Sequence, residues 1–341
     1  MRRTGLVLGT LLLLGIAAAW LRPGGTPAFA QGKPEDAVVV YSAADADMVN
    51  AMVAAFQRKH PGIKASTVVA GTGELIKRVE AESARPLGDV VWSAGPEAIA
   101  GKKALFEPYR SGEAAAFFPG QVPADQTWTP FTTMPYVIMY NKKLVPDAEA
   151  PKTWKDVLAP RWKGKVAYAD ATKSGSSYTL LVTWLTLYGK NDTGWKFVED
   201  LLRQTKVLPK SSMTYQMVAN GELPVGLTFE QGAFDFLKSG APVGIVYPSE
   251  GTAVIPDGSA LVKNAPHPQA ARLFLDFTVS AEGQQLVVEK FGRRSVRKDV
   301  TSPAGLPALD AIKAIEYDLA YAADNRVQIL KRFQDTLVKT Q

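Results

Sequence analysis

The chain has no cysteine among its 341 residues and only two histidines. The absence of cysteine excludes disulfides, thiol nucleophiles, iron–sulfur clusters and cysteine-ligated zinc. His60 belongs to a helix-ending His-Pro-Gly, and His267 lies between two prolines, so neither occurs in a catalytic motif. The sequence also lacks the Gly-x-Ser-x-Gly, His-Glu-x-x-His, P-loop and Gly-x-Gly-x-x-Gly patterns. We therefore expect no enzymatic activity, no resident metal and no cofactor.

Runs of basic residues are missing as well. The formal net charge is +6, and it falls to about +3 if the basic residues of the N-terminal leader are removed. Without a Lys/Arg-rich stretch, nucleic acid is not an expected partner. About 310 residues of ordinary apolar content suggest two domains, each with its own core.

The only long apolar run lies at the N-terminus, from Leu6 to Trp20. It follows Met1-Arg2-Arg3 and precedes the small-residue site Ala28-Phe29-Ala30, an order typical of a secretory signal peptide. The predicted signal peptide is 1–30, with cleavage after Ala30. Because the leader has no cysteine for lipid attachment, we expect a free periplasmic protein.

The first third of the chain alternates strand and helix patterns. Short apolar runs at 38–41, 65–70 and 89–93 predict buried strands. The segment between the first two carries Met48, Met52 and Phe56 at four-residue spacing, which predicts a helix ending near His60-Pro61. This order predicts a parallel sheet with right-handed crossovers.

Small and polar residues follow each of the three predicted strands: Ser42-Ala43, Gly71-Thr72-Gly73 and Ser93-Ala94-Gly95. In parallel sheets, ligands bind beyond the carboxyl ends of the strands, where helices begin. Glycine and serine are also common in such loops simply because the chain must turn there. The sequence therefore predicts a ligand site but leaves this plainer alternative open.

The segment Lys173-Ser174-Gly175-Ser176-Ser177-Tyr178-Thr179 precedes a long apolar run that predicts a helix. The first turn of a helix presents unpaired N–H groups at its positive end, and small residues let an anion approach them. We predict a cradle for a phosphate, phosphonate or carboxylate group. The alternative is an ordinary serine N-cap.

The extended pattern of 128–140 and the strand expected at 260–262 predict two crossings between two domains. We expect a first lobe made of 31–134 and 252–341, and a second lobe made of 135–251. Two crossings form a hinge that can close on a ligand.

These features resemble the periplasmic solute-binding proteins of ABC importers, in the branch that contains ferric-iron, thiamine, phosphonate and sugar-phosphate binders. The resemblance covers nearly all of the expected mature chain. It rests on Val39-Val40-Tyr41-Ser42, Gly88-Asp89-Val90-Val91-Trp92, Pro160 to Val166, Ser174-Gly175-Ser176 and Ala270 to Phe277. It implies an α/β periplasmic binding protein type II fold, with two lobes that each have a mainly parallel sheet flanked by helices.

The resemblance is weaker for the ferric-iron members. Asp45 stands where their first-loop histidine would fall, Ala94 stands near their glutamate, and Thr228-Phe229 replaces their tyrosine pair. The phosphorylated-solute members match better, because they hold anions with small-residue loops. Glu230 is expected to accept hydrogen bonds from an amine or a sugar hydroxyl of the solute. The alternative is that Glu230 is simply an acidic residue at a helix start, where the helix dipole favours it. Tyr247 and Glu250 belong to a loop that resembles the late binding loop of these members.

We therefore expect a monomer that captures a small anionic solute and delivers it to an inner-membrane ABC permease with a separate ATPase subunit. The alternatives are a ferric-iron or thiamine binder of the same fold, a sensor for a membrane receptor, and a phosphate-ester hydrolase. The predicted ligand-binding residues are Ser42, Ala43, Thr72, Gly73, Ser93, Gly95, Ser174, Gly175, Ser176, Ser177, Glu230, Tyr247 and Glu250.

Overall fold

The computed structural model describes residues 35–340, so the predicted signal peptide and its cleavage site lie outside the described residues. In the first lobe, three parallel strands lie in the order β2, β1, β3, and a helix follows each strand. This arrangement confirms the predicted alternation. The elements are β1 (Ala37–Ser42), α1 (Ala46–Lys59), β2 (Lys64–Val69), α2 (Thr72–Ala81), β3 (Val90–Ala94) and α3 (Pro96–Ala100).

Helix α1 illustrates how the sequence pattern becomes packing. Met48, Met52 and Phe56 face the core and are almost fully buried, which stabilises the lobe by about 1.5–3 kcal/mol for each side chain. The Phe56 ring meets that of Phe274 edge to face, with 5.2 Å between centroids. The N–H of His60, just past the helix end, donates to the Phe56 carbonyl, and Pro61 cannot continue the helical hydrogen bonding.

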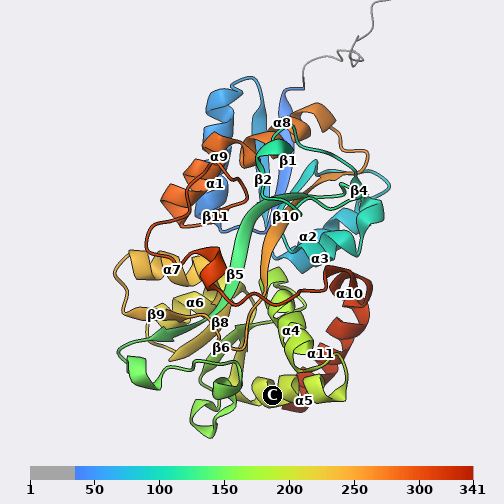
Figure 1. Ribbon diagram of the computed structural model, residues 1–341. Helices are drawn as coiled ribbons and strands as arrows, with labels where there is room; N and C mark the ends of the chain where they lie inside the picture. The colour runs from blue at the N-terminus through green and yellow to red at the C-terminus, as the bar shows by residue number, and fades with distance from the viewer. Residues whose placement is uncertain (1–34, 341) are drawn as a thin grey trace, which may run out of the picture. The chain divides into compact units, whose positions relative to one another are not determined.

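Strand β5 (Thr129–Asn141) passes through both lobes (Figure 1). Its first half pairs with β10 (Val254–Val262) and β11 (Arg294–Ser295), and its second half pairs with β8 (Val225–Phe229) and β9 (Val243–Val246). The partner changes between Pro135, which is opposite Val254, and Tyr136, which is opposite Phe229. Strand β10 brings the chain back and pairs with β3 and the short β4 (Phe106–Glu107). The extended segment predicted over 128–140 is confirmed.

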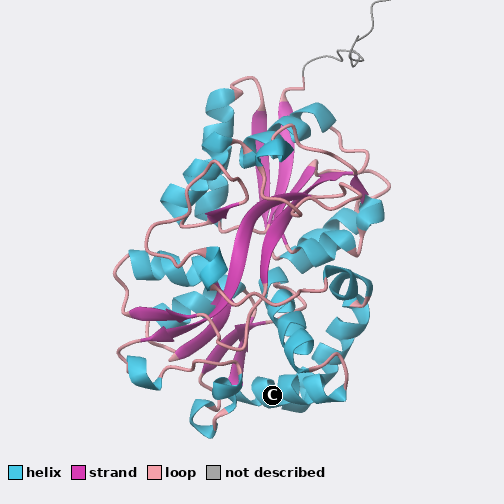
Figure 2. Cartoon of the chain, viewed as in Figure 1, coloured by secondary structure: helices cyan, strands magenta, loops and turns pink. Residues whose placement is uncertain are grey.

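In the second lobe, β8, β6 and β7 continue the sheet as parallel neighbours. Helices flank the strands in both lobes (Figure 2). The elements of this lobe that follow β5 are β6 (Val166–Ala169), α4 (Gly175–Tyr188), α5 (Asp192–Gln204), β7 (Thr205–Leu208), α6 (Ser211–Ala219) and α7 (Glu230–Lys238), together with β8 and β9.

Three aromatic side chains form the centre of the second lobe's core. The Tyr168 ring packs against Trp184 with 5.2 Å between centroids, and Trp184 in turn meets Trp154 edge to face at 5.8 Å. All three side chains are fully buried. Large aromatic side chains contribute much of the stability of a core, because each removes an extensive apolar surface from water.

The C-terminal region divides between the lobes, whereas the sequence-based boundary gave all of 252–341 to the first lobe. Helices α8 (Pro268–Val279) and α9 (Ala281–Phe291) pack in the first lobe as expected, but α11 (Arg326–Thr340) contributes Ile329 and Phe333 to the core of the second. Phe333 is fully buried and lies 6.3 Å from the Tyr168 ring. The apolar spacing of this segment is typical of a helix, but periodicity does not say which core the helix covers.

The remaining described elements are short. They are α10 (Leu319–Asp324) and the 3₁₀ helices Lys103–Leu105, Ala114–Ala116, Asp147–Glu149, Lys155–Leu158, Pro160–Trp162 and Leu309–Ala311. Within residues 35–340, no helix is both long and apolar enough to cross a lipid bilayer.

Candidate functional site

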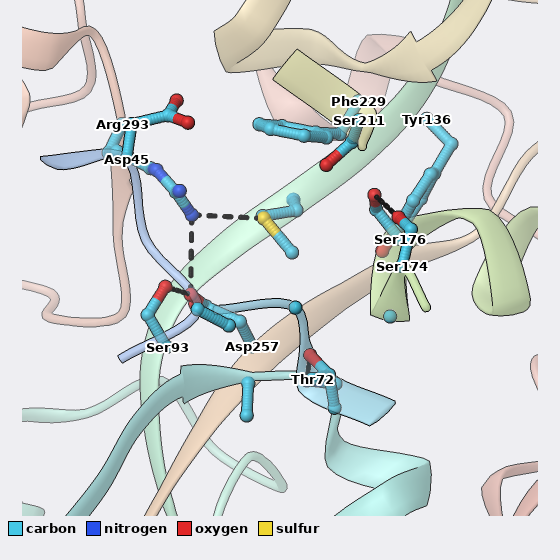
Figure 3. Close-up of a pocket in the computed structure, with 16 residues that line it drawn as sticks. Asp45, Thr72, Ser93, Tyr136, Ser174, Ser176, Ser211, Phe229, Asp257 and Arg293 are labelled. Carbon is cyan, nitrogen blue, oxygen red and sulfur yellow. Dashed lines mark hydrogen bonds and ion pairs between the residues drawn. The ribbon is translucent and has the colours of Figure 1, made fainter. Parts of the chain in front are cut away.

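A cavity of about 70 Å³ lies where loops from the first lobe meet α4 and α6 of the second (Figure 3). It sits beyond the carboxyl ends of β1, β3 and β6, the position at which parallel sheets bind ligands. We call it the inner cavity. It is lined by Ala43, Asp45, Gly71, Thr72, Ser93, Ala94, Gly95, Met134, Tyr136, Ser174, Gly175, Ser176, Ser211, Phe229, Asp257 and Arg293.

Four of the described helices begin at the inner cavity, and the short α3 begins beside it. Asp45 precedes α1, Gly71 precedes α2, Ser174 caps α4, and Ser211 is the first residue of α6. The Ser174 hydroxyl accepts from the N–H of Ser177 (3.2 Å), so the earlier N–H groups of α4 have no capping partner there. Because each helix start carries a partial positive charge, the four ends together favour an anion.

Arg293 adds a full positive charge to the inner cavity, although it is only 4% exposed. Its Nη1 atom donates to Thr132 Oγ1 (3.1 Å) and Asp257 Oδ2 (3.2 Å) and contacts the Met134 sulfur (3.0 Å). Its Nε atom has no hydrogen-bond partner among the described residues. A buried donor without a partner is costly, so the guanidinium has an unused capacity to bind an acceptor.

Asp257 holds the arginine in place. Its Oδ1 atom accepts from the Thr132 N–H (2.8 Å) and hydroxyl (2.7 Å), and its Oδ2 atom accepts from Ser93 Oγ (2.5 Å) as well as from Arg293. Ser93 has a φ of 56°, a left-handed conformation that is uncommon for residues other than glycine. Because the Ser93 hydroxyl donates to Asp257, it is not free to donate to a ligand.

A wider cavity of about 710 Å³ adjoins the inner one and shares Ala43, Asp45, Gly71, Ser174 and Ser211 with it. We call it the outer cavity. Asp45 lies beside both, and its Oδ2 atom accepts from the Tyr215 hydroxyl (2.6 Å) instead of capping α1. Burial raises the pKa of Tyr215, and the Asp45 carboxylate raises it further. Tyr215 therefore stays a neutral donor to this carboxylate.

The two lobes touch directly around the inner cavity. The Gly73 N–H donates to the Lys173 carbonyl (3.4 Å), and the Thr179 hydroxyl donates to Glu97 Oε1 (2.7 Å). A Cβ atom at Gly175 would lie 2.6 Å from Thr72 Oγ1, so only glycine fits there at this separation of the lobes. The structure therefore represents a closed arrangement.

Seven of the residues expected to bind ligand line the inner cavity: Ala43, Thr72, Ser93, Gly95, Ser174, Gly175 and Ser176. Three others are sequence neighbours of these lining residues. Ser42 is fully buried and its hydroxyl accepts from the Ala44 N–H (3.1 Å), while the Ser177 carbonyl accepts from the Tyr168 hydroxyl (2.6 Å). Gly73 faces the other lobe, against the Thr172 carbonyl.

The structure places the other three expected ligand-binding residues away from both cavities. Glu230 is 2% exposed and forms a two-pronged ion pair with Arg294 (Oε2 to Nε 2.6 Å, Oε1 to Nη2 2.9 Å). The Tyr247 hydroxyl donates to the same carboxylate (2.5 Å). Glu250 accepts from the Trp154 N–H (2.6 Å). None of the three lines either cavity, and each forms a hydrogen bond within the protein instead.

Sequence reasoning missed Arg293 and Asp257 as site residues. The adjacent Arg293-Arg294 pair was the available signal, but it gave no way to tell which arginine faces a ligand. Only the pairing of β11 with β5 places them, since one side chain then meets Asp257 and the other meets Glu230. Within residues 35–340, no three His, Cys, Asp or Glu side chains come close enough together to hold a metal ion.

Comparison with known proteins assigns the family. Residues 51–314 match the model of the bacterial extracellular solute-binding protein family. The chain is 30% identical over 294 residues to an uncharacterised protein of Haemophilus influenzae, covering 82% of this chain and 84% of the relative. It is 26% identical over 312 residues to iron uptake protein A1 of Synechocystis, covering 84% of each.

Two further similarities concern a curated relative and a solved structure. A putative 2-aminoethylphosphonate-binding periplasmic protein of Salmonella paratyphi A is 26% identical over 260 residues, covering 71% of this chain and 72% of the relative. The solved structure of the periplasmic binding protein AfuA from Actinobacillus pleuropneumoniae, with fructose 6-phosphate bound, superposes with a TM-score of 0.82 at 24% identity, covering 88% of this chain and 98% of that one. This likeness confirms the expected type II periplasmic binding protein fold. The chain belongs to the bacterial extracellular solute-binding protein family.

Proposed function

We propose that this protein captures a small organic anion, a phosphonate or a phosphate ester, between its two lobes and delivers it to an ABC permease. In this proposal it is a periplasmic monomer, it does not transform its solute, and a separate subunit hydrolyses ATP. The observation that carries the proposal is Arg293, which lines a cavity where four of the described helices begin and whose buried Nε atom has no partner among the described residues.

The geometry suits a phosphorus oxyanion. Such a group has several acceptor oxygens, and the cavity offers helix-start N–H groups, the hydroxyls of Ser174 and Ser176, and the guanidinium. These donors come from both lobes, so an anion between them favours the closed state over the open one. A ligand shifts such an equilibrium only by its extra affinity for the closed state.

The same cavity is poorly suited to ferric iron. Fe³⁺ prefers oxygen anions, and the tyrosine that lines the inner cavity, Tyr136, is 1% exposed. Burial raises the pKa of Tyr136 well above its usual value, so its hydroxyl is neutral in the ligand-free protein. The inner cavity therefore lacks the tyrosine pair of the ferric-iron binders, and one of its two carboxylates, Asp257, is already paired with Arg293.

Calorimetry on mature protein, refolded after denaturing dialysis to strip bound ligand, tests the proposal. The panel should contain phosphonates, hexose phosphates, inorganic phosphate, thiamine and ferric citrate. We expect Arg293→Gln to weaken binding by about 10- to 100-fold, because a hydrogen bond to a charged group contributes about 1.5–3 kcal/mol. We expect Ser176→Asp to abolish binding, because it places a negative charge beside the anion.

Arg161→Gln is the matched control, since Arg161 is exposed and lines neither cavity. Unchanged anion affinity in the Arg293 and Ser176 variants would refute the assigned site. Binding of ferric citrate alone would refute the anion proposal, and turnover of a phosphate ester would refute the proposal that the protein only binds.

A further inference from the structure

One wall of the outer cavity is made of hydrogen-bond acceptors that lack donors. Gln231 is 4% exposed and lines this cavity, and its Oε1 atom has no partner among the described residues. Its amide nitrogen donates to Asp235 Oδ2. The buried amide oxygen is therefore left at a polar cavity with nothing to accept from, and such an atom is normally satisfied in a folded protein.

Two carboxylates line the same cavity, one from each lobe. Asp45, at the start of α1, uses only Oδ2, for the Tyr215 hydroxyl, and Asp235, on α7, uses only Oδ2, for the Gln231 amide. No donor to either Oδ1 atom is present among residues 35–340. Closing the lobes thus brings two acidic groups toward each other without a compensating donor between them.

The positively charged side chains nearby do not neutralise the carboxylates of Asp45 and Asp235. Arg293 is held by Asp257 (3.2 Å), and Lys238, on the same helix as Asp235, donates to the Glu289 carbonyl (2.7 Å). The other charged residues that line the outer cavity are exposed to solvent; they are Asp47, Glu74, Lys173 and Lys210. Asp45 and Asp235 are half-buried, so Coulomb attraction to them is stronger than to these exposed side chains.

We propose that Asp45, Gln231 and Asp235 form a second subsite that binds a protonated amine of the same solute whose anion occupies the inner cavity. The solute is then a zwitterion, an ammonium group joined to a phosphorus oxyanion. An ammonium has three donors, and each of the three side chains offers an unfilled acceptor. This inference rests on the proposed function, because it uses the inner cavity as the anion site.

The electrostatics of Asp235 agree with this role. The pKa of Asp235 is raised to about 7, chiefly by burial and in smaller part by the Asp45 carboxylate, against the opposing effects of the Gln231 amide, Arg293 and Lys238. A bound ammonium stabilises the ionised carboxylate, so ligand binding should release a proton. The affinity for an amine-bearing anion should accordingly rise as pH increases from about 6 to about 8.

The test compares 2-aminoethylphosphonate with ethylphosphonate, which has the same anion and no amine, by calorimetry at two pH values. We expect the amine-bearing compound to bind at least about tenfold tighter, equivalent to about 1.4 kcal/mol. Asp235→Asn should reduce this ratio while leaving ethylphosphonate affinity nearly unchanged, because Asp235 lines only the outer cavity. Asp45→Asn should also reduce the ratio, but it should strengthen ethylphosphonate binding, because Asp45 lines the inner cavity as well. Heats of binding in buffers of different ionisation enthalpy should show a proton release with the amine-bearing compound that is smaller in Asp235→Asn.

Asp47→Asn is the matched control, because Asp47 is an exposed carboxylate that lines the same cavity. Equal affinity for the two phosphonates in the unchanged protein would overturn the subsite but leave the proposed function standing. Binding of neither compound, with a hexose phosphate still bound, would also overturn the subsite, whereas binding of no phosphorus oxyanion at all would contradict the proposed function itself. A thermal melt of each variant separates loss of the subsite from loss of the fold.

Discussion

At the residue scale, two neighbouring arginines have different roles. Arg293 lines the inner cavity, whereas Arg294 is 1% exposed, lines neither cavity and gives two of its nitrogens to Glu230. Each arginine also keeps one nitrogen without a partner among the described residues. The Glu230 and Arg294 pair, with the Tyr247 hydroxyl, joins α7 to β11 across the hinge region. Its geometry indicates a structural contact rather than a ligand contact.

Removing one partner of this pair should therefore lower stability without changing ligand choice. We expect Glu230→Ala to reduce the free energy of unfolding by about 3–5 kcal/mol, because it leaves the Arg294 charge buried and unpaired. Urea unfolding of the ligand-free protein measures this loss. Glu250→Ala serves for comparison, since its carboxylate accepts from a backbone N–H. A stable Glu230→Ala protein with altered solute preference would show instead that Glu230 reads the ligand.

At the element scale, the starts of α2 and α4 set how closely the lobes approach. Gly175, the first residue of α4, has room for no Cβ atom, because one would lie 2.6 Å from Thr72 Oγ1 and 3.2 Å from the Gly95 nitrogen. The contact joins elements of different lobes, so it exists only when they are closed. Alanine itself is a good helix residue, and the second lobe should tolerate it.

We expect Gly175→Ala to disfavour the closed state and to weaken solute binding several-fold, with little change in thermal stability. Small-angle X-ray scattering with and without a saturating phosphonate would follow closure, and calorimetry would give the affinity. The control is Gly62→Ala, where an added Cβ atom would meet nothing within 4 Å. Full closure and unchanged affinity in Gly175→Ala would mean that the lobes pack less tightly in solution than in this structure.

At the scale of the whole molecule, stability depends on pH through a carboxylate that lines the outer cavity, where the two lobes meet. The pKa of Asp235, in the second lobe, is raised from an ordinary value of 3.8 to about 7, chiefly by burial and in smaller part by the charge of Asp45 from the first lobe. The folded state therefore keeps a proton that the unfolded chain releases between these two values. In that window, stability falls as pH rises.

The expected result is a ligand-free protein that loses stability as pH increases from about 4 to about 7 through this group. The loss should be smaller in Asp235→Asn, which has no proton to release. Urea unfolding of both proteins at several pH values, compared as a difference, isolates the contribution of Asp235 from that of other groups. Parallel curves for the two proteins would contradict the raised pKa.

The sequence by itself determined the alternation of strands and helices, the long crossing strand and seven of the residues that line the inner cavity. Local signals are sufficient for these features, because apolar periodicity, helix starts and small loop residues act over a few neighbouring positions. Tertiary structure decided the rest. It packs α11 against the core of the second lobe and pairs Glu230 with Arg294. It also places Asp45, Asp235 and Arg293, which come from distant parts of the chain, around the two cavities. Charged residues that are far apart in the sequence meet only when the sheets are assembled, and no local pattern records which partner each will find.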